Sequence, residues 1–167
     1  MLAACACLAG CAGNNPPLAT VEHVDLDRFM GDWYVIANIP TFLEKNAYNA
    51  VESYERNSDG TIATTFVYRK GGFDGKIKEY TPTAWVLDEE NNAVWGMQFV
   101  WPIKADYRIV YLTDDYSQTI IARNKRDYVW VMARTPAIDD ADYARIVSLI
   151  ESMGYDISDL HKVPQRW

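Results

Sequence analysis

Apolar and polar side chains alternate every second residue along most of this sequence, and clusters of turn-forming residues interrupt the alternation. The pattern predicts eight β-strands, at residues 33–39, 50–56, 62–68, 79–86, 93–99, 107–112, 119–123 and 128–134. Connections such as 57–60 and 71–75 are rich in the Asn, Asp and Gly that tight turns require. Consecutive strands with short connections predict an up-and-down antiparallel sheet, and eight such strands close into a β-barrel.

One amphipathic helix is expected after the last strand. Asp139 can cap its start, Gly154 suits the residue after its end, and four apolar residues recur on one face: Tyr143, Ile146, Val147 and Ile150. A single helix cannot cross a filled barrel, so we expect it to pack against the outside. Residues 160–163 predict a short terminal strand.

The first residues are small and apolar and lead into Leu8-Ala9-Gly10-Cys11. This run is far shorter than the roughly 20 residues that span a bilayer, and it is typical of the end of a signal peptide. It resembles the bacterial lipobox, in which the peptide is cleaved before the Cys and the Cys is acylated, although no Lys or Arg precedes it. All three cysteines (Cys5, Cys7 and Cys11) lie here, so the folded body is expected to contain no disulfide and no Cys-based metal site.

The net charge of −7 argues against nucleic acid as a partner, because phosphate binding needs a basic face. Catalysis is also not expected, since the sequence has no Gly-x-Ser-x-Gly motif and its two histidines, His23 and His161, lie outside the predicted strands. The same positions disfavour a haem site, and we expect no cofactor and no metal. An inward-facing acid pair among the 23 acidic residues stays open.

Three short motifs carry a resemblance to a known family. Gly31-Asp32-Trp33 matches a G-x-W at the start of the first strand, Thr113-Asp114-Asp115-Tyr116 resembles a T-D-Y segment, and Arg134 ends the eighth strand. In this order the motifs resemble those of the lipocalin family, and the resemblance extends from about residue 26 to residue 163. Within the family, the sequence resembles the bacterial outer-membrane lipocalins and apolipoprotein D in particular. The resemblance implies structural roles for Gly31, Trp33, Asp114, Tyr116 and Arg134, with the Arg134 guanidinium lying across the Trp33 ring at the barrel floor.

The resemblance also implies a division of the chain and a place in the cell. Residues 1–10 would be the signal peptide remnant, residues 11–24 the acylated Cys11 with its tether, and residues 25–167 the lipocalin domain. Lipid attachment at Cys11 would anchor the protein in the outer membrane of a Gram-negative envelope. The oligomeric state stays open, with a homodimer as one alternative.

Strand parity predicts the residues that line the barrel interior, because alternate side chains share a face. Twelve are expected to bind the ligand: Val35, Ala37, Phe66, Trp85, Trp95, Met97, Phe99, Tyr107, Ile109, Tyr128, Trp130 and Met132. Rings and thioethers suit an acyl chain, so we expect a fatty acid or lysophospholipid, whose headgroup would lie near Lys45, Arg69, Lys70 or Lys104. The alternatives are an enzyme that acts on a bound lipid in such a barrel, and a structural envelope barrel without a ligand.

Overall fold

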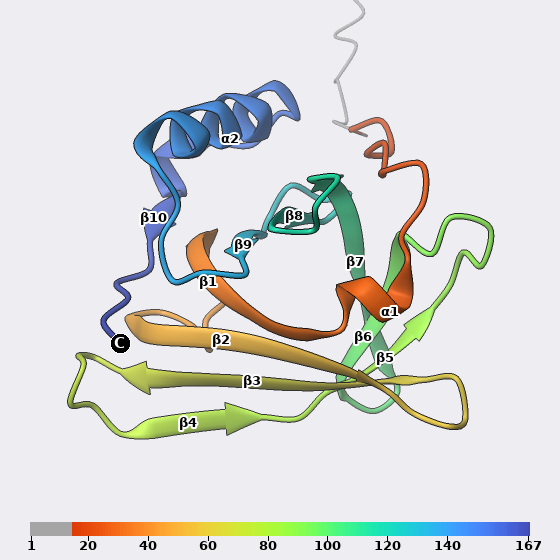
Figure 1. Cartoon of the computed structure of the whole chain (residues 1–167), viewed down its shortest axis with the longest axis horizontal. Helices are drawn as coiled ribbons and strands as arrows, with labels where there is room; N and C mark the ends of the chain where they lie inside the picture. The colour runs from red at the N-terminus through yellow and green to blue at the C-terminus, as the bar shows by residue number, and fades with distance from the viewer. Residues whose placement is uncertain (1–14) are drawn as a thin grey trace, which may run out of the picture.

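The computed structural model describes residues 15–167, so the signal peptide remnant and Cys11 lie outside the described residues. The chain forms a closed antiparallel barrel with one long helix on its outside (Figure 1). The strands that close it are β1 (Gly31–Ile39), β2 (Ala47–Arg56), β3 (Ile62–Lys70), β4 (Ile77–Tyr80), β5 (Thr83–Val86), β6 (Val94–Val100), β7 (Ile103–Leu112), β8 (Gln118–Ala122) and β9 (Val129–Ala133). Pairing of β9 with β1 closes the sheet, which confirms the predicted up-and-down barrel.

The fourth predicted strand, at residues 79–86, is divided in the structure. Both β4 and β5 pair with β3, and Thr81 and Pro82 separate them. Proline has no N–H for the ladder, which explains the break, while the Pro82 carbonyl still accepts a bond from the Thr64 N–H at 3.1 Å. Together β4 and β5 fill the place of one barrel strand.

The predicted helix is confirmed as α2 (Asp140–Ser152), with the Asp139 carboxylate accepting from the Asp142 N–H at 2.7 Å. Its buried residues, Ile146 and Ile150, pack on the outer face of the barrel. A 3-10 turn, η1 (Ile157–Asp159), leads to the short strand β10 (His161–Lys162), which pairs with β1. Within residues 15–167, no helix has the length and apolar character needed to cross a membrane.

A β-bulge in β1 changes which side chains face the interior. Val35 pairs with Met132 and Ala37 pairs with Val131, so one extra residue lies between two successive pairs. Val35 therefore packs in the interior, whereas Ala37 lies in the apolar cluster beneath α2. The expectation that Ala37 shares the inward face of Trp33 is wrong for this reason.

A short helix that the sequence pattern did not predict, α1 (Leu26–Phe29), closes one end of the barrel. The Asp25 carboxylate caps it by accepting from the N–H groups of Asp27 and Arg28. Phe29 packs against Trp33, with ring centroids 5.0 Å apart, and the Phe29 carbonyl accepts from the Trp33 indole N–H at 2.9 Å. Four residues give no helical periodicity, so only the capping Asp could have indicated this turn.

Arg134 takes the position that the family resemblance implies. Its guanidinium carbon lies 3.8 Å from the centroid of the Trp33 ring. Its nitrogens donate to four backbone carbonyls at 2.8–3.0 Å, those of Arg28, Phe29, Met30 and Asp32. Since the last carbonyls of α1 have no partner within the helix, Arg134 also terminates α1.

Aromatic rings fill the barrel above this floor. Phe29, Tyr54, Trp95 and Tyr107 contact one another, and the stacked rings of Trp95 and Tyr107 have centroids 5.2 Å apart. The hydroxyls of Tyr54 and Tyr107 are 2.5 Å apart. This half of the interior is therefore packed, and any ligand has to occupy the other half.

Candidate ligand-binding cavity

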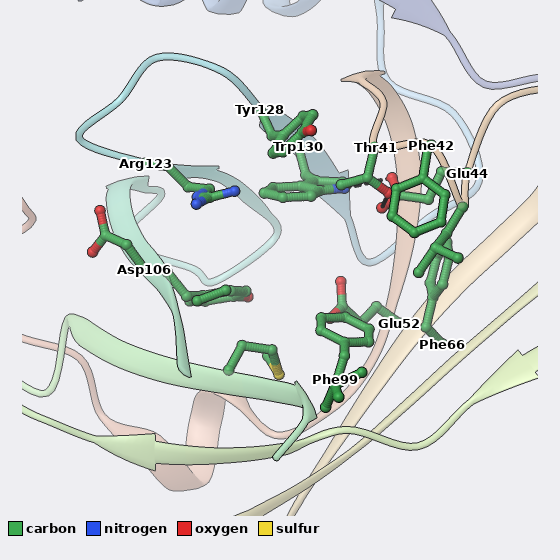
Figure 2. A pocket seen from close by; sticks show the side chains of 15 residues that line it. Thr41, Phe42, Glu44, Glu52, Phe66, Phe99, Asp106, Arg123, Tyr128 and Trp130 are labelled. Atoms are coloured by element: carbon green, nitrogen blue, oxygen red, sulfur yellow. Dashed lines mark hydrogen bonds between the residues drawn. The ribbon is translucent and has the colours of Figure 1, made fainter. Parts of the chain in front are cut away.

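A cavity of about 260 Å³ occupies the half of the barrel that the rings leave free (Figure 2). Strand β6 shows the transition, because Trp95 packs in the aromatic layer whereas Met97 and Phe99 line the cavity. Loops and strand ends complete the wall. The lining residues are Thr41, Phe42, Leu43, Glu44, Glu52, Phe66, Met97, Phe99, Val100, Ala105, Asp106, Tyr107, Arg123, Tyr128 and Trp130.

Half of the twelve residues expected to bind a ligand line this cavity: Phe66, Met97, Phe99, Tyr107, Tyr128 and Trp130. Four others face the interior but belong to the packed core: Val35, Trp95, Ile109 and Met132. The remaining two, Ala37 and Trp85, lie outside the barrel. Ligand contact stays a prediction for the lining residues.

Trp85 lies on the outer face of the sheet. Trp85 pairs with Gly96 on β6, and the Lys104 ammonium lies 3.9 Å from the centroid of the Trp85 ring. Lys104 also covers Gly96, because a Cβ added to Gly96 would lie 3.2 Å from the Lys104 Cβ. The inward parity expected for Trp85 is therefore wrong. Lys104 is held on the same outer face and does not line the cavity.

The other expected headgroup residues also lie away from the cavity. Arg69 donates to the Gly75 carbonyl at 3.3 Å, and Lys70 donates to the Lys45 carbonyl at 3.0 Å. The cation on the wall is Arg123 instead, whose Nε is buried without a partner among the described residues. Strand parity could have found it, because Arg123 comes two residues after the inward-facing Ile121.

Two buried glutamates also face this region, and they form the inward acid pair that the sequence left open. Glu44 follows β1 in a loop and is held by three donors: Trp130 Nε1 at 2.7 Å, Asn38 Nδ2 at 2.8 Å and Thr41 Oγ1 at 2.9 Å. Burial nevertheless raises the pKa of Glu44, because desolvation outweighs these hydrogen bonds. A loop residue has no periodicity, so no sequence pattern indicated Glu44.

Glu52 is the second member of the pair and lies on β2 between two buried neighbours, Ala50 and Tyr54. Only 8% of the residue is exposed, and its carboxyl points into the cavity (Figure 2). Burial raises the pKa of Glu52 to about 8, and the nearby charge of Glu44 adds to this rise. Parity within residues 50–56 places Glu52 on the inward face, which was the available signal.

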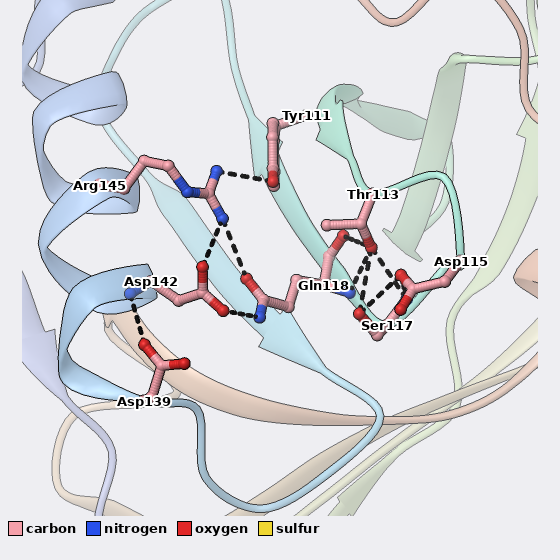
Figure 3. Close-up of polar contacts among 8 residues, drawn as sticks. All are labelled: Tyr111, Thr113, Asp115, Ser117, Gln118, Asp139, Asp142 and Arg145. Carbon is pink, nitrogen blue, oxygen red and sulfur yellow. Dashed lines mark hydrogen bonds and ion pairs between the residues drawn. The ribbon is translucent and has the colours of Figure 1, made fainter.

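A second polar cluster lies outside the barrel, where α2 meets the sheet (Figure 3). Asp142 accepts from the Gln118 amide at 2.6 Å and from the Arg145 guanidinium at 2.9 Å, which lowers the pKa of Asp142. Arg145 also donates to the Tyr111 hydroxyl at 2.7 Å. All these groups are partnered with one another, so the cluster fixes the helix on the barrel.

The loop that follows β7 fixes the closed end. Arg28 donates to the Asp114 carbonyl at 2.9 Å and lies 4.0 Å from the centroid of the Tyr116 ring. The Tyr116 hydroxyl accepts from the Asp25 N–H at 2.8 Å. This loop therefore holds α1 against the barrel floor.

Comparison with known proteins agrees with this geometry, since residues 24–165 match the model of the lipocalin-like domain. The chain belongs to the lipocalin family. Temperature-induced lipocalin-1 of Arabidopsis thaliana is 31% identical over 89% of this chain and 83% of its own length. Outer membrane lipoprotein Blc of Escherichia coli is 25% identical over 95% of this chain and 90% of its own length. Insecticyanin of the tobacco hornworm Manduca sexta has the same fold, with a TM-score of 0.70 and 13% identity. The match covers 90% of this chain and 86% of insecticyanin.

The expected kinship with bacterial outer-membrane lipocalins is thus confirmed, and it extends to a plant lipocalin. Lipocalins typically bind small hydrophobic ligands. The cavity of this lipocalin provides a matching apolar space.

Proposed function

We propose that this lipocalin carries one fatty acid or lysophospholipid molecule in its cavity, and that it stores or transports this lipid for membrane maintenance in a bacterial envelope without chemical change. The observation that supports the proposal most is the open cavity of about 260 Å³ walled by Phe42, Phe66, Met97 and Phe99. Such a wall suits an acyl chain better than a sugar or a nucleotide.

The energetics are favourable without a strong charge interaction. Each buried methylene contributes about 0.8 kcal/mol, and loss of translational freedom and lipid ordering offset part of the sum. Arg123 lines the cavity and could meet an anionic headgroup, and its Nη1 also lies 3.5 Å from the Asp127 carboxylate. Micromolar affinity is therefore within reach.

A fluorescent fatty acid should bind the delipidated protein at one site with roughly micromolar affinity. Binding should quench tryptophan emission, because Trp130 lines the cavity. The affinity should change little between low and high salt, since burial of the chain drives binding. Fluorescence titration at two salt concentrations measures both, and absence of binding by any acyl lipid would leave a structural barrel as the function.

A matched pair of variants locates the ligand. Met97→Asp places a charge against the acyl chain and should weaken binding by at least about tenfold. Gln98→Asp is the control, because Gln98 is the next residue on β6 and is not among the residues that line the cavity. Equal affinities of the two variants would place the ligand elsewhere.

The envelope location rests on Cys11 and on the relative in Escherichia coli, which is named an outer membrane lipoprotein. Ala12 follows Cys11, and in the usual sorting pattern the absence of Asp there favours release to the outer membrane. Membrane fractionation of a Gram-negative host should recover the wild-type protein with the outer membrane and should deplete Cys11→Ser from that fraction, because the variant cannot accept the lipid. Identical partitioning of the two would contradict lipid attachment at Cys11.

A further inference from the structure

Glu52 is the one cavity-facing acid whose carboxyl lacks a set of donors in the described part of the chain. Burial of an ionisable group without hydrogen-bond partners costs free energy, so the position of the Glu52 carboxyl in the cavity needs an explanation. The groups that act on its pKa are the Glu44 carboxyl and the Tyr54 hydroxyl, and neither is a cation. The contrast with Glu44, which has three donors, is direct.

The neighbours of Glu52 cannot fully satisfy it. The Tyr54 hydroxyl has a single proton, and it already lies 2.5 Å from the Tyr107 hydroxyl. Even if Tyr107 donates to Tyr54 and Tyr54 to Glu52, only one carboxyl oxygen obtains a donor. The carboxyl lies in the cavity near Phe66 and Phe99 (Figure 2), and Met97 lines the same cavity.

We propose that Glu52 is the polar anchor of the cavity and binds a hydroxyl group carried by an otherwise apolar lipid. This inference rests on the proposed function, and it narrows the ligand to lipids with a hydroxyl. A fatty alcohol offers that group at the end of its chain, and a monoacylglycerol or a lysophospholipid offers it on glycerol.

The surroundings of Glu52 favour a hydroxyl over a charged group. With a pKa of about 8, Glu52 is mainly neutral at pH 7 and presents one O–H and one carbonyl oxygen. A hydroxyl both donates and accepts, so it can pair with both. At Glu52 itself, a ligand carboxylate would bring a negative charge beside two acids, and an ammonium would meet a neutral partner.

The test compares ligands that share a twelve-carbon chain. We measure displacement of a fluorescent fatty acid at pH 7 by 1-dodecanol, dodecanoate, dodecylamine and monododecanoylglycerol. At least one hydroxyl compound should bind about tenfold more tightly than dodecanoate and dodecylamine. A preference for 1-dodecanol places the hydroxyl at the chain end, and a preference for the glyceride alone places it on glycerol.

Three variants assign the preference to Glu52. Glu52→Leu removes the anchor and should abolish the preference, whereas Glu52→Gln keeps a donor and an acceptor and should retain most of it. Glu55→Leu is the control, because Glu55 lies on the same strand but is exposed. Circular dichroism checks folding, and Glu52→Ala replaces the Leu variant if that variant does not fold.

The outcomes separate this inference from the proposed function. Equal or tighter binding of dodecanoate by the wild type, or an undiminished preference in Glu52→Leu, overturns the hydroxyl assignment and leaves the lipid carrier in place. Failure of the fluorescent fatty acid and of all four twelve-carbon compounds to bind the wild type overturns both.

Discussion

Replacement of Arg134 by Ala should lower the free energy of unfolding by about 3 kcal/mol or more. The guanidinium donates to four backbone carbonyls, of which those of Phe29 and Met30 are part-buried, and it covers the Trp33 ring, so its loss removes these donors and opens the floor. A buried acceptor left unsatisfied costs about 1–3 kcal/mol, and the space left over the Trp33 ring adds to that cost. Trp33→Ala should cost about as much, because the fully buried indole leaves a cavity.

Urea unfolding followed by circular dichroism measures these changes. Arg145→Ala is the matched control, since Arg145 also lies over a tyrosine ring, 5.1 Å from the centroid, but is largely exposed. The control should lose less than about 1 kcal/mol. Loss of ligand binding at unchanged stability would instead make Arg134 and Trp33 ligand-binding residues.

The strands were predictable from the sequence because half-buried strands need alternating side chains. The alternation holds at Met97 and Phe99 on β6 and at Tyr128 and Trp130, just before and on β9, and these residues line the cavity as parity predicted. It failed where backbone geometry interrupts the period of two. The bulge before Ala37 adds one residue, and the break at Thr81 and Pro82 precedes the strand on which Trp85 was given the wrong face.

The site was predicted less completely than the fold, and the reason differs between residues. Glu52 lies on β2 and Arg123 directly follows β8, both at inward parity, but a search for apolar lining residues passes over charged side chains at such positions. Glu44 lies in a loop, and its carboxylate accepts from Asn38 and Trp130. Trp130 is remote in sequence, and the contact with Asn38 depends on the conformation of the loop. Tertiary contacts of this kind carry no local pattern.

The depth of the cavity was likewise not predictable from parity. Parity places Trp95 and Met97 on one face but does not say which of them is covered by other rings. The structure shows that Phe29 from α1 packs against Trp95, with ring centroids 5.4 Å apart, and fills the lower barrel. Because α1 itself lacks a periodic signal, the boundary between core and cavity followed only from the fold.

The buried Glu52 carboxyl should make the stability of the wild type depend on pH in a way that Glu52→Gln removes. In the folded state the pKa of Glu52 is about 8, because burial and the Glu44 charge disfavour ionisation, whereas a glutamate in the unfolded chain has a pKa near the ordinary value of 4.5. Below pH 4.5 both states hold the proton and Glu52 imposes no penalty. Between pH 4.5 and 8 the unfolded chain releases the proton first, so the folded state loses stability as the pH rises.

The difference in unfolding free energy between Glu52→Gln and the wild type should therefore grow in favour of the variant by about 3 kcal/mol from pH 5 to pH 8, because stability changes by about 1.4 kcal/mol per pH unit between the two pKa values. Urea unfolding of both proteins at several pH values measures it, with the exposed Glu55→Gln as control. Parallel pH profiles for Glu52→Gln and the wild type would mean that Glu52 ionises as an exposed glutamate does.

A lipid hydroxyl bound to neutral Glu52 should raise the pKa of Glu52 further. The pH profile of the lipid-loaded wild type should therefore move to higher pH, and that of lipid-loaded Glu52→Gln should not.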